Sequence, residues 1–131
     1  MCLITKQTEA KIADKDIKCY KVVERCGVGY KTPWRNTYVD YETSKGKKFF
    51  EALTPETFEE GLIPGERSIT GGFVHCYTDL GLAIGCSKLL GNGTCFECII
   101  PKGTPYFNGT TLDICAKKIK FVKPVVYVPN K

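Results

Sequence analysis

The chain has 131 residues, of which 43% are hydrophobic, 25% charged and 11% aromatic, and its net charge is +5. This composition predicts a single globular domain and excludes an intrinsically disordered chain, because aromatic residues are plentiful and the charge is moderate. No apolar run approaches the ~20 residues that a membrane-spanning helix needs, so we expect no membrane partner.

The first part of the chain predicts an arm followed by a strand. Residues 1–16 are polar and mixed in charge, which predicts an N-terminal arm ahead of a single domain at 17–131. The run IKCYKVVE at 17–24 is rich in β-branched and aromatic residues and predicts the first core strand. Two glycines and a proline predict a loop over 26–41, with an edge strand at 37–41.

The middle of the chain predicts a short helix between less regular segments. Residues 46–53 are compatible with either a strand or a short helix. In TPETFEEGL at 54–62, Thr54 is a suitable N-cap, acidic residues follow in the first turns and Gly61 ends the helix. The glycines and proline of 63–72 predict a loop.

The clearest unit is a strand followed by a helix. GFVHCYT at 72–78 predicts a strand, and Asp79 is a suitable N-cap for a helix at 80–90. Gly81 and Gly85 weaken this helix unless a neighbouring element packs closely against them.

The remaining segments predict strands with one loop between them. A strand at 94–101 ends at a proline, a loop with an Asn-Gly turn covers 102–113, and one or two strands cover 114–128. Helix content is low, and the strands show no βαβ regularity. We therefore expect an α+β fold, with a small mixed or antiparallel sheet and one or two short helices.

The positive charge is concentrated in the second half of the chain. Residues 67–131 contain eight basic and three acidic residues, whereas 1–66 contain eleven of each. Four of the eight form one cluster: Lys117, Lys118, Lys120 and Lys123. This cluster is either a solvated strand edge, where lysines prevent edge-to-edge pairing, or a contact for phosphate. Aromatic residues do not interleave with it, so duplex nucleic acid is not an expected partner.

The eight cysteines bear on compartment and on metal binding. The N-terminal sequence lacks the apolar stretch of a signal peptide, which predicts a cytoplasmic chain whose cysteines are reduced and mostly buried. Cys95 and Cys98 form a CxxC pair, but strand alternation places them on opposite faces, and no second CxxC exists. We therefore expect no bound metal.

Catalytic motifs are lacking, but five residues are candidates for a site. P-loop, Rossmann, nucleophile-elbow and HExxH patterns are absent, so no cofactor is expected. His75 and Tyr77 lie opposite the core face of their strand, where they either line a cleft or make structural hydrogen bonds. Glu97, in an apolar strand, either faces solvent or is a functional carboxylate, and it is the candidate catalytic residue. Trp34 and Arg35 either contact an anion or pin their loop to the domain.

The chain resembles a group of small bacterial and phage proteins. The resemblance is carried by short segments: MCL at 1–3, YKV at 20–22, GFVH at 72–75, IPKGTPY at 100–106 and AKKI at 116–119.

More distantly, the chain resembles ADP-ribosyltransferase-like domains, whose NAD site combines an Arg or His on a first strand, a polar residue where a later strand enters a helix, and a strand glutamate. The resemblance implies Tyr20 or Lys21 at the first position, His75 or Tyr77 at the second and Glu97 at the third. Because the first position is neither Arg nor His, it implies nucleotide binding without turnover at least as readily as transfer.

We expect a small cytoplasmic binding module, without catalysis, for a nucleotide-like or phosphorylated small molecule or a protein partner. Its candidate ligand-binding residues are Tyr20, Lys21, Trp34, Arg35, His75, Tyr77 and Glu97. One alternative is an ADP-ribosyltransferase-like or NAD-cleaving enzyme in which Glu97 stabilises a cationic transition state. Another alternative is a structural or assembly protein.

Overall fold

The computed structural model describes residues 3–26, 29–31, 38–39, 49–52, 54–90 and 93–125. Their elements in chain order are β1 (Leu3–Thr5), β2 (Lys11–Ile12), β3 (Ile17–Cys26), β4 (Gly29–Lys31), β5 (Tyr38–Val39), β6 (Phe50–Glu51), β7 (Thr57–Glu60), β8 (Arg67–Gly71), β9 (Val74–Tyr77), α2 (Leu80–Leu89), β10 (Gly93–Ile100), β11 (Pro105–Asn108), β12 (Asp113–Ala116) and β13 (Lys118–Pro124). Residues 3–5 and 11–12, inside the segment expected to be an arm, thus form strands.

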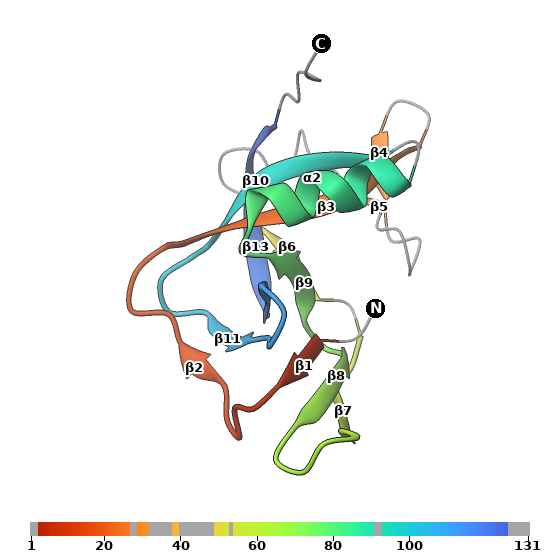
Figure 1. The fold of residues 1–131 in the computed structure, drawn as a ribbon. Helices are drawn as coiled ribbons and strands as arrows, with labels where there is room; N and C mark the ends of the chain where they lie inside the picture. The colour runs from red at the N-terminus through yellow and green to blue at the C-terminus, as the bar shows by residue number, and fades with distance from the viewer. Residues whose placement is uncertain are drawn as a thin grey trace.

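In the described part of the chain the strands form two antiparallel sheets. The smaller has three strands in the order β1-β8-β7. The larger has ten, in the order β2-β11-β12-β9-β3-β10-β13-β6, with β4 and β5 branching from β3. Figure 1 shows α2 lying along β3 and β10, with the small sheet at the far end of the molecule from this helix. No helix of the described residues is long and apolar enough to cross a membrane.

The expected α+β class is wrong, because the described residues are mostly β with one short helix. The segment expected as a helix at 54–62 contains the strand β7, and the loops expected at 63–72 and 102–113 contain β8 and β11. As a strand residue, Phe58 reaches two aromatic rings, those of Phe73 and Phe107. A helix over this polar segment would lack the continuous apolar stripe that packing requires.

The helix expected at 80–90 is confirmed as α2. The carboxylate of Asp79 accepts a hydrogen bond from the backbone N–H of Leu82 at 2.9 Å, as an N-cap should. The strands expected at 17–24 and 94–101 are likewise present as β3 and β10.

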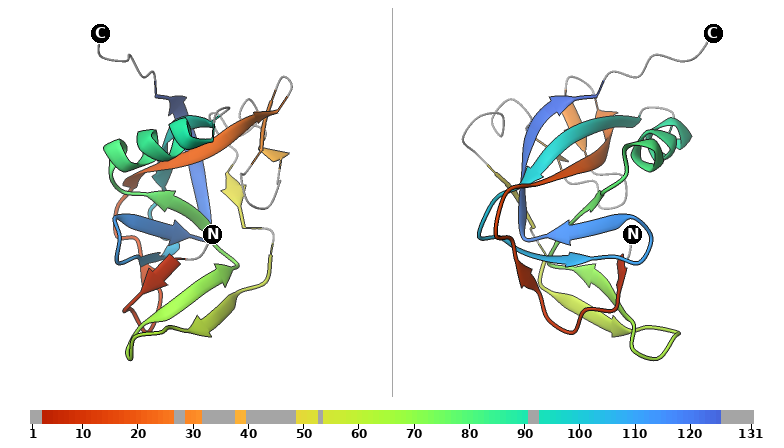
Figure 2. Two further views of the ribbon diagram at one scale, coloured as in Figure 1. Left: turned by 45° about the vertical axis from the view of Figure 1, so that its right-hand side comes forward. Right: turned by 60° about the vertical axis from the view of Figure 1, so that its left-hand side comes forward.

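Figure 2 shows that the strands of the ten-stranded sheet curve. We call the face that carries the largest apolar cluster the inner face of this sheet. Strands from the middle of the sheet contribute residues such as Cys19, Phe96 and Phe121. Phe50 of β6 and Ala13, next to β2, belong to opposite ends of the strand order, yet both pack against this one cluster. The sheet therefore curls around its own core.

Two smaller clusters lie on the outer face of the same sheet. One joins it to the small sheet and contains Leu3, Ile69, Phe73, Phe107 and Cys115. The other lies beneath α2 and contains Val22, Tyr77, Ala83 and Cys95. Each outer cluster thus has its own covering element.

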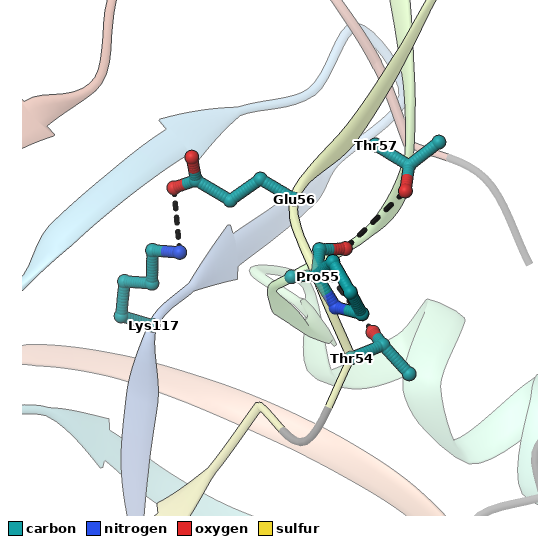
Figure 3. Close-up of polar contacts among 6 residues, drawn as sticks. Thr54, Pro55, Glu56, Thr57 and Lys117 are labelled. Atoms are coloured by element: carbon teal, nitrogen blue, oxygen red, sulfur yellow. Dashed lines mark hydrogen bonds and ion pairs between the residues drawn. The ribbon is translucent and has the colours of Figure 1, made fainter.

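A polar contact also links the small sheet to the large one (Figure 3). Glu56, immediately before β7, forms an ion pair with Lys117, between β12 and β13, at 2.5 Å. The Lys117 Nζ also lies 4.6 Å from the ring centroid of Phe73. Beside this pair, the Thr57 hydroxyl donates to the carbonyl of Pro55 at 3.2 Å, which fixes the entry into β7.

Candidate functional site

Three of the predicted site residues lie in one row across neighbouring strands. Tyr20 of β3 is the register partner of Tyr77 on β9 and of Glu97 on β10. Glu97 is in turn opposite Lys123 of β13. Because directly opposite residues of an antiparallel sheet point to the same face, these four side chains share the outer face of the sheet.

Tyr77 occupies the part of this row that α2 covers. Its side chain belongs to the cluster beneath the helix, and the residue is 8% exposed. Burial and a hydrogen bond with the Cys86 thiol on α2 raise the pKa of the Tyr77 hydroxyl well above its ordinary value. Tyr77 is therefore a neutral residue that helps to seat the helix, and Tyr20 packs against the same cluster.

Glu97 lies where the row leaves the cover of the helix. Its side chain is 20% exposed and forms an ion pair with Lys18 of β3 at 3.6 Å. The pairing of β10 with β13 shifts register between Glu97 and Cys98, and such an irregularity bends a strand and re-aims its side chains. The carboxylate is thus held at the surface of the sheet and available as a hydrogen-bond acceptor.

Three lysines from the two strands that flank β10 lie near this carboxylate. Lys18 and Lys120 flank Ile99 from the two neighbouring strands, and Lys123 lies opposite Glu97. We call Lys18, Tyr20, Glu97, Lys120 and Lys123 the outer-face site. It contains three ammonium groups, one carboxylate and one half-buried aromatic ring.

The predicted lysine cluster at 117–123 is divided by the fold. Lys117 is engaged with Glu56, and the Lys118 Nζ lies 4.7 Å from the ring centroid of Phe49. Lys120 and Lys123 belong instead to the outer-face site. Only half of the cluster is therefore placed to meet a ligand there.

His75 and Lys21 lie apart from the outer-face site. His75 is on the outer side of β9, opposite Cys115 of β12, whereas Val74 and Cys76 belong to the inner core, as the alternation of this strand predicted. Lys21 is 9% exposed and its Nζ donates a hydrogen bond to the backbone carbonyl of His75 at 2.9 Å. The remaining two predicted residues, Trp34 and Arg35, lie outside the described residues.

A cluster that the sequence reasoning missed surrounds Lys21. Cys19 and Cys76 belong to the inner core, and both interact electrostatically with Lys21. Cys98 of β10 is the register partner of Cys19 and interacts with the same ammonium. The sequence signal was present in the alternation of β3, which places Cys19, Lys21 and Val23 on one face.

The groups of this buried cluster shift one another's pKa. A hydrogen bond from Cys19, together with the charge of Lys21, lowers the pKa of the Cys76 thiol despite its burial. The same hydrogen bond, followed by burial, raises the pKa of Cys19. Burial lowers the pKa of Lys21, and the three thiols oppose that shift. Cys76 is therefore the thiol of the cluster that ionises most readily.

No group of three or more His, Cys, Asp or Glu side chains among the described residues is arranged to hold a metal ion. Cys95 and Cys98 lie on opposite faces, as strand alternation predicted, because Cys95 packs beneath α2 and Cys98 in the inner core.

No protein-family model matches the sequence, and no curated protein or solved structure matches it either. What the outer-face site does must therefore be inferred from the chemistry of its own residues.

Proposed function

We propose that the chain is a small binding module that takes a phosphorylated, nucleotide-like small molecule at the outer-face site. The observation that carries the proposal is the register that brings Lys18, Lys120 and Lys123 around Glu97 and Tyr20. Three ammonium groups against one carboxylate leave an excess of positive charge, which attracts phosphate.

Each residue type has a role in this proposal. The lysines contact phosphate oxygens as point charges. The half-buried ring of Tyr20, which packs against the cluster that contains Tyr77, offers a flat apolar surface on which a base can stack. Glu97 accepts hydrogen bonds from the hydroxyl groups of a sugar, which inorganic phosphates lack. The residues of the outer-face site therefore favour a nucleotide over inorganic phosphate.

The test is calorimetric titration of the full chain with ADP and, separately, with inorganic pyrophosphate. We expect the double variant Lys120→Ala/Lys123→Ala to bind both probes at least about tenfold more weakly, because two phosphate contacts are lost. The matched control is Lys6→Ala/Lys11→Ala, which removes the same charge from exposed lysines elsewhere. Equal affinities in the two double variants would refute the outer-face site.

The variant Glu97→Gln distinguishes a site that recognises a nucleotide from a site that recognises phosphate alone. We expect it to weaken ADP binding and to leave pyrophosphate binding equal or tighter, because the variant removes a negative charge and weakens a hydrogen-bond acceptor. Incubation with NAD tests the enzymatic alternative on the same samples, since nicotinamide release that depends on Glu97 would replace the binding proposal with catalysis.

A further inference from the structure

The strongest unexplained chemistry in the described residues is the buried group of Lys21, Cys19 and Cys76. Cys19 is fully buried, and Cys76 is 2% exposed. Lys21 is the buried amine beside them, and its Nζ donates a hydrogen bond to the backbone carbonyl of His75, which carries no negative charge. A buried ammonium is costly without a negative neighbour, and a thiolate is the one that this cluster supplies.

The two cysteines belong to one buried cluster, and their strands pair at Tyr20 and Tyr77, the residues next to them in the chain. The Cys19 thiol donates a hydrogen bond to the Cys76 sulfur and keeps its proton, and this hydrogen bond and the charge of Lys21 both favour the thiolate form of Cys76. A thiolate is the form of cysteine that reacts with peroxides and disulfides. The arrangement therefore contains a nucleophile, a second thiol within hydrogen-bond reach of it and a proton donor.

The location of the pair also offers a route for a reagent. In the described residues β3 pairs with β9 at one position, Tyr20 with Tyr77, whereas it pairs with β10 at eight. The next residues on the two strands are Lys21 and Cys76. A seam held by so few backbone hydrogen bonds opens locally at lower cost than the rest of the sheet.

We propose that Cys19 and Cys76 form a reversible redox site that closes to a disulfide when a peroxide oxidises Cys76, with Lys21 as the residue that holds the thiolate. This site is separate from the outer-face site, because its residues lie on the inner face of the sheet.

The chemistry balances with hydrogen peroxide as the oxidant. The Cys76 thiolate attacks one peroxide oxygen, the S–O bond forms and the O–O bond breaks. The hydroxide that leaves takes a proton from the Lys21 ammonium and departs as water, so that Cys76 becomes a sulfenic acid. The Cys19 sulfur then attacks the Cys76 sulfur, the S–S bond forms, and the hydroxyl leaves as a second water with the Cys19 proton. Two thiols are oxidised, one peroxide is reduced, and Lys21 remains as a neutral amine beside a neutral disulfide.

The test uses the folded, fully reduced full chain and hydrogen peroxide as the probe. After oxidation the free thiols are alkylated in denaturant, and the labelled chain is digested and mapped by mass spectrometry. We expect Cys19 and Cys76 to lose their labels together, a linked peptide that contains both, and full recovery of the labels after treatment with dithiothreitol. A link between other cysteines, or one that forms only in urea, would overturn the proposal.

Two matched variants distinguish the pair from general thiol oxidation. Cys19→Ala is expected to stop the reaction at a sulfenic acid on Cys76, which dimedone traps. Cys115→Ala removes another fully buried cysteine from a different cluster and should leave the linked peptide unchanged. If Cys115→Ala prevents the link as completely as Cys19→Ala does, the assignment of the pair is wrong.

Two substitutions of Lys21 test whether its positive charge holds the Cys76 thiolate. Lys21→Met should slow disulfide formation at least about tenfold, because the thiolate loses its cationic neighbour, and Lys21→Arg should restore part of the rate. Equal rates in Lys21→Met and the wild type would remove Lys21 from the proposal. If Lys21→Met does not fold, the comparison of Cys19→Ala with Cys115→Ala still decides whether the pair exists.

Discussion

Lys21 shows how one side chain combines a structural and a chemical role. Its Nζ donates to the His75 carbonyl at the point where β3 and β9 cease to pair, so it supplies a hydrogen bond that the backbone ladder does not. An acceptor left unpaired in a protein interior costs on the order of 1–3 kcal/mol, so this contact stabilises the diverging strands. The same position brings the ammonium next to the Cys19 and Cys76 thiols.

At the residue scale, Cys95 makes stability fall at alkaline pH. Burial raises the pKa of its thiol from 9.0 to about 11. Between these two pH values the folded state keeps a proton that the unfolded state has lost. The contribution of Cys95 to the free energy of unfolding is therefore full below pH 9 and is lost as the pH rises toward about 11. The wild type loses this contribution as the pH rises, whereas Cys95→Ala has no thiol to titrate. We therefore expect the difference in the free energy of unfolding between the two proteins to shrink by up to about 2 kcal/mol over this pH range.

Urea denaturation of both proteins between pH 7 and 11 measures this gap. The packing lost on truncation is the same at every pH, so the difference at pH 7 serves as the internal reference. A gap that stays constant to pH 11 would show that Cys95 does not titrate differently in the folded state.

Among the secondary-structure elements, helix α2 contains two glycines that lower its stability. Gly81 and Gly85 both lie in it, and the sequence predicts that they weaken the helix unless a neighbour packs closely. A Cβ at Gly85 would meet nothing within 4 Å, and one at Gly81 would approach only the Asp79 carboxylate at 3.3 Å. In the described structure neither glycine is required by close packing from another element.

We therefore expect Gly85→Ala to stabilise the chain by about 0.5–1 kcal/mol, because alanine restricts the unfolded chain and favours the helix. Gly93→Ala is the matched control and should destabilise the chain, because its Cβ would clash with the backbone carbonyl oxygen of Ser87. Urea midpoints of the two variants and the wild type measure both effects. Destabilisation by Gly85→Ala, accompanied by a smaller oligomer, would instead indicate that a second copy packs on this face.

At the scale of the whole molecule, the small sheet is held by aromatic contacts. The rings of Phe58, Phe73 and Phe107 contact one another edge to face, with centroids 5.4–6.0 Å apart. The guanidinium of Arg67 lies 5.0 Å from the ring centroid of Phe58. With the half-exposed ion pair between Glu56 and Lys117, these contacts join the small sheet to the large one through a cluster that is separate from the inner core.

Because the cluster that holds the small sheet is separate from the inner core, we expect the small sheet to open without unfolding the rest of the large sheet. We expect Phe73→Ala to cost about 3–5 kcal/mol locally and to speed hydrogen exchange in β1, β7 and β8, with β3 and β10 unchanged. Phe121→Ala, in the inner core, is the control and should speed exchange in β3 and β10 as well. Equal acceleration of all strands by Phe73→Ala would mean that the two sheets unfold as one unit.

The candidate site was predictable only in part. Alternation correctly placed Val74 and Cys76 in the core and His75 on the other face. The choice of Glu97, an acid in an apolar strand, stays a prediction, and the structure pairs its carboxylate with Lys18. Neither pattern shows that Tyr20 is the register partner of Glu97, because that depends on how β3 pairs with β10. The same limit hid the contact between Cys19 and Cys76.

By itself the sequence determined the features that arise within a few residues: the helix that begins after Asp79, the strands β3 and β10, and the two faces of β9. Only the tertiary structure decided that Thr57–Glu60 is a strand, that the fold is mostly β, and which side chains share the outer-face site. The physical reason is range. N-caps and alternation act between near neighbours, whereas strand pairing and register depend on partners far along the chain, whose packing overrides a weak local preference.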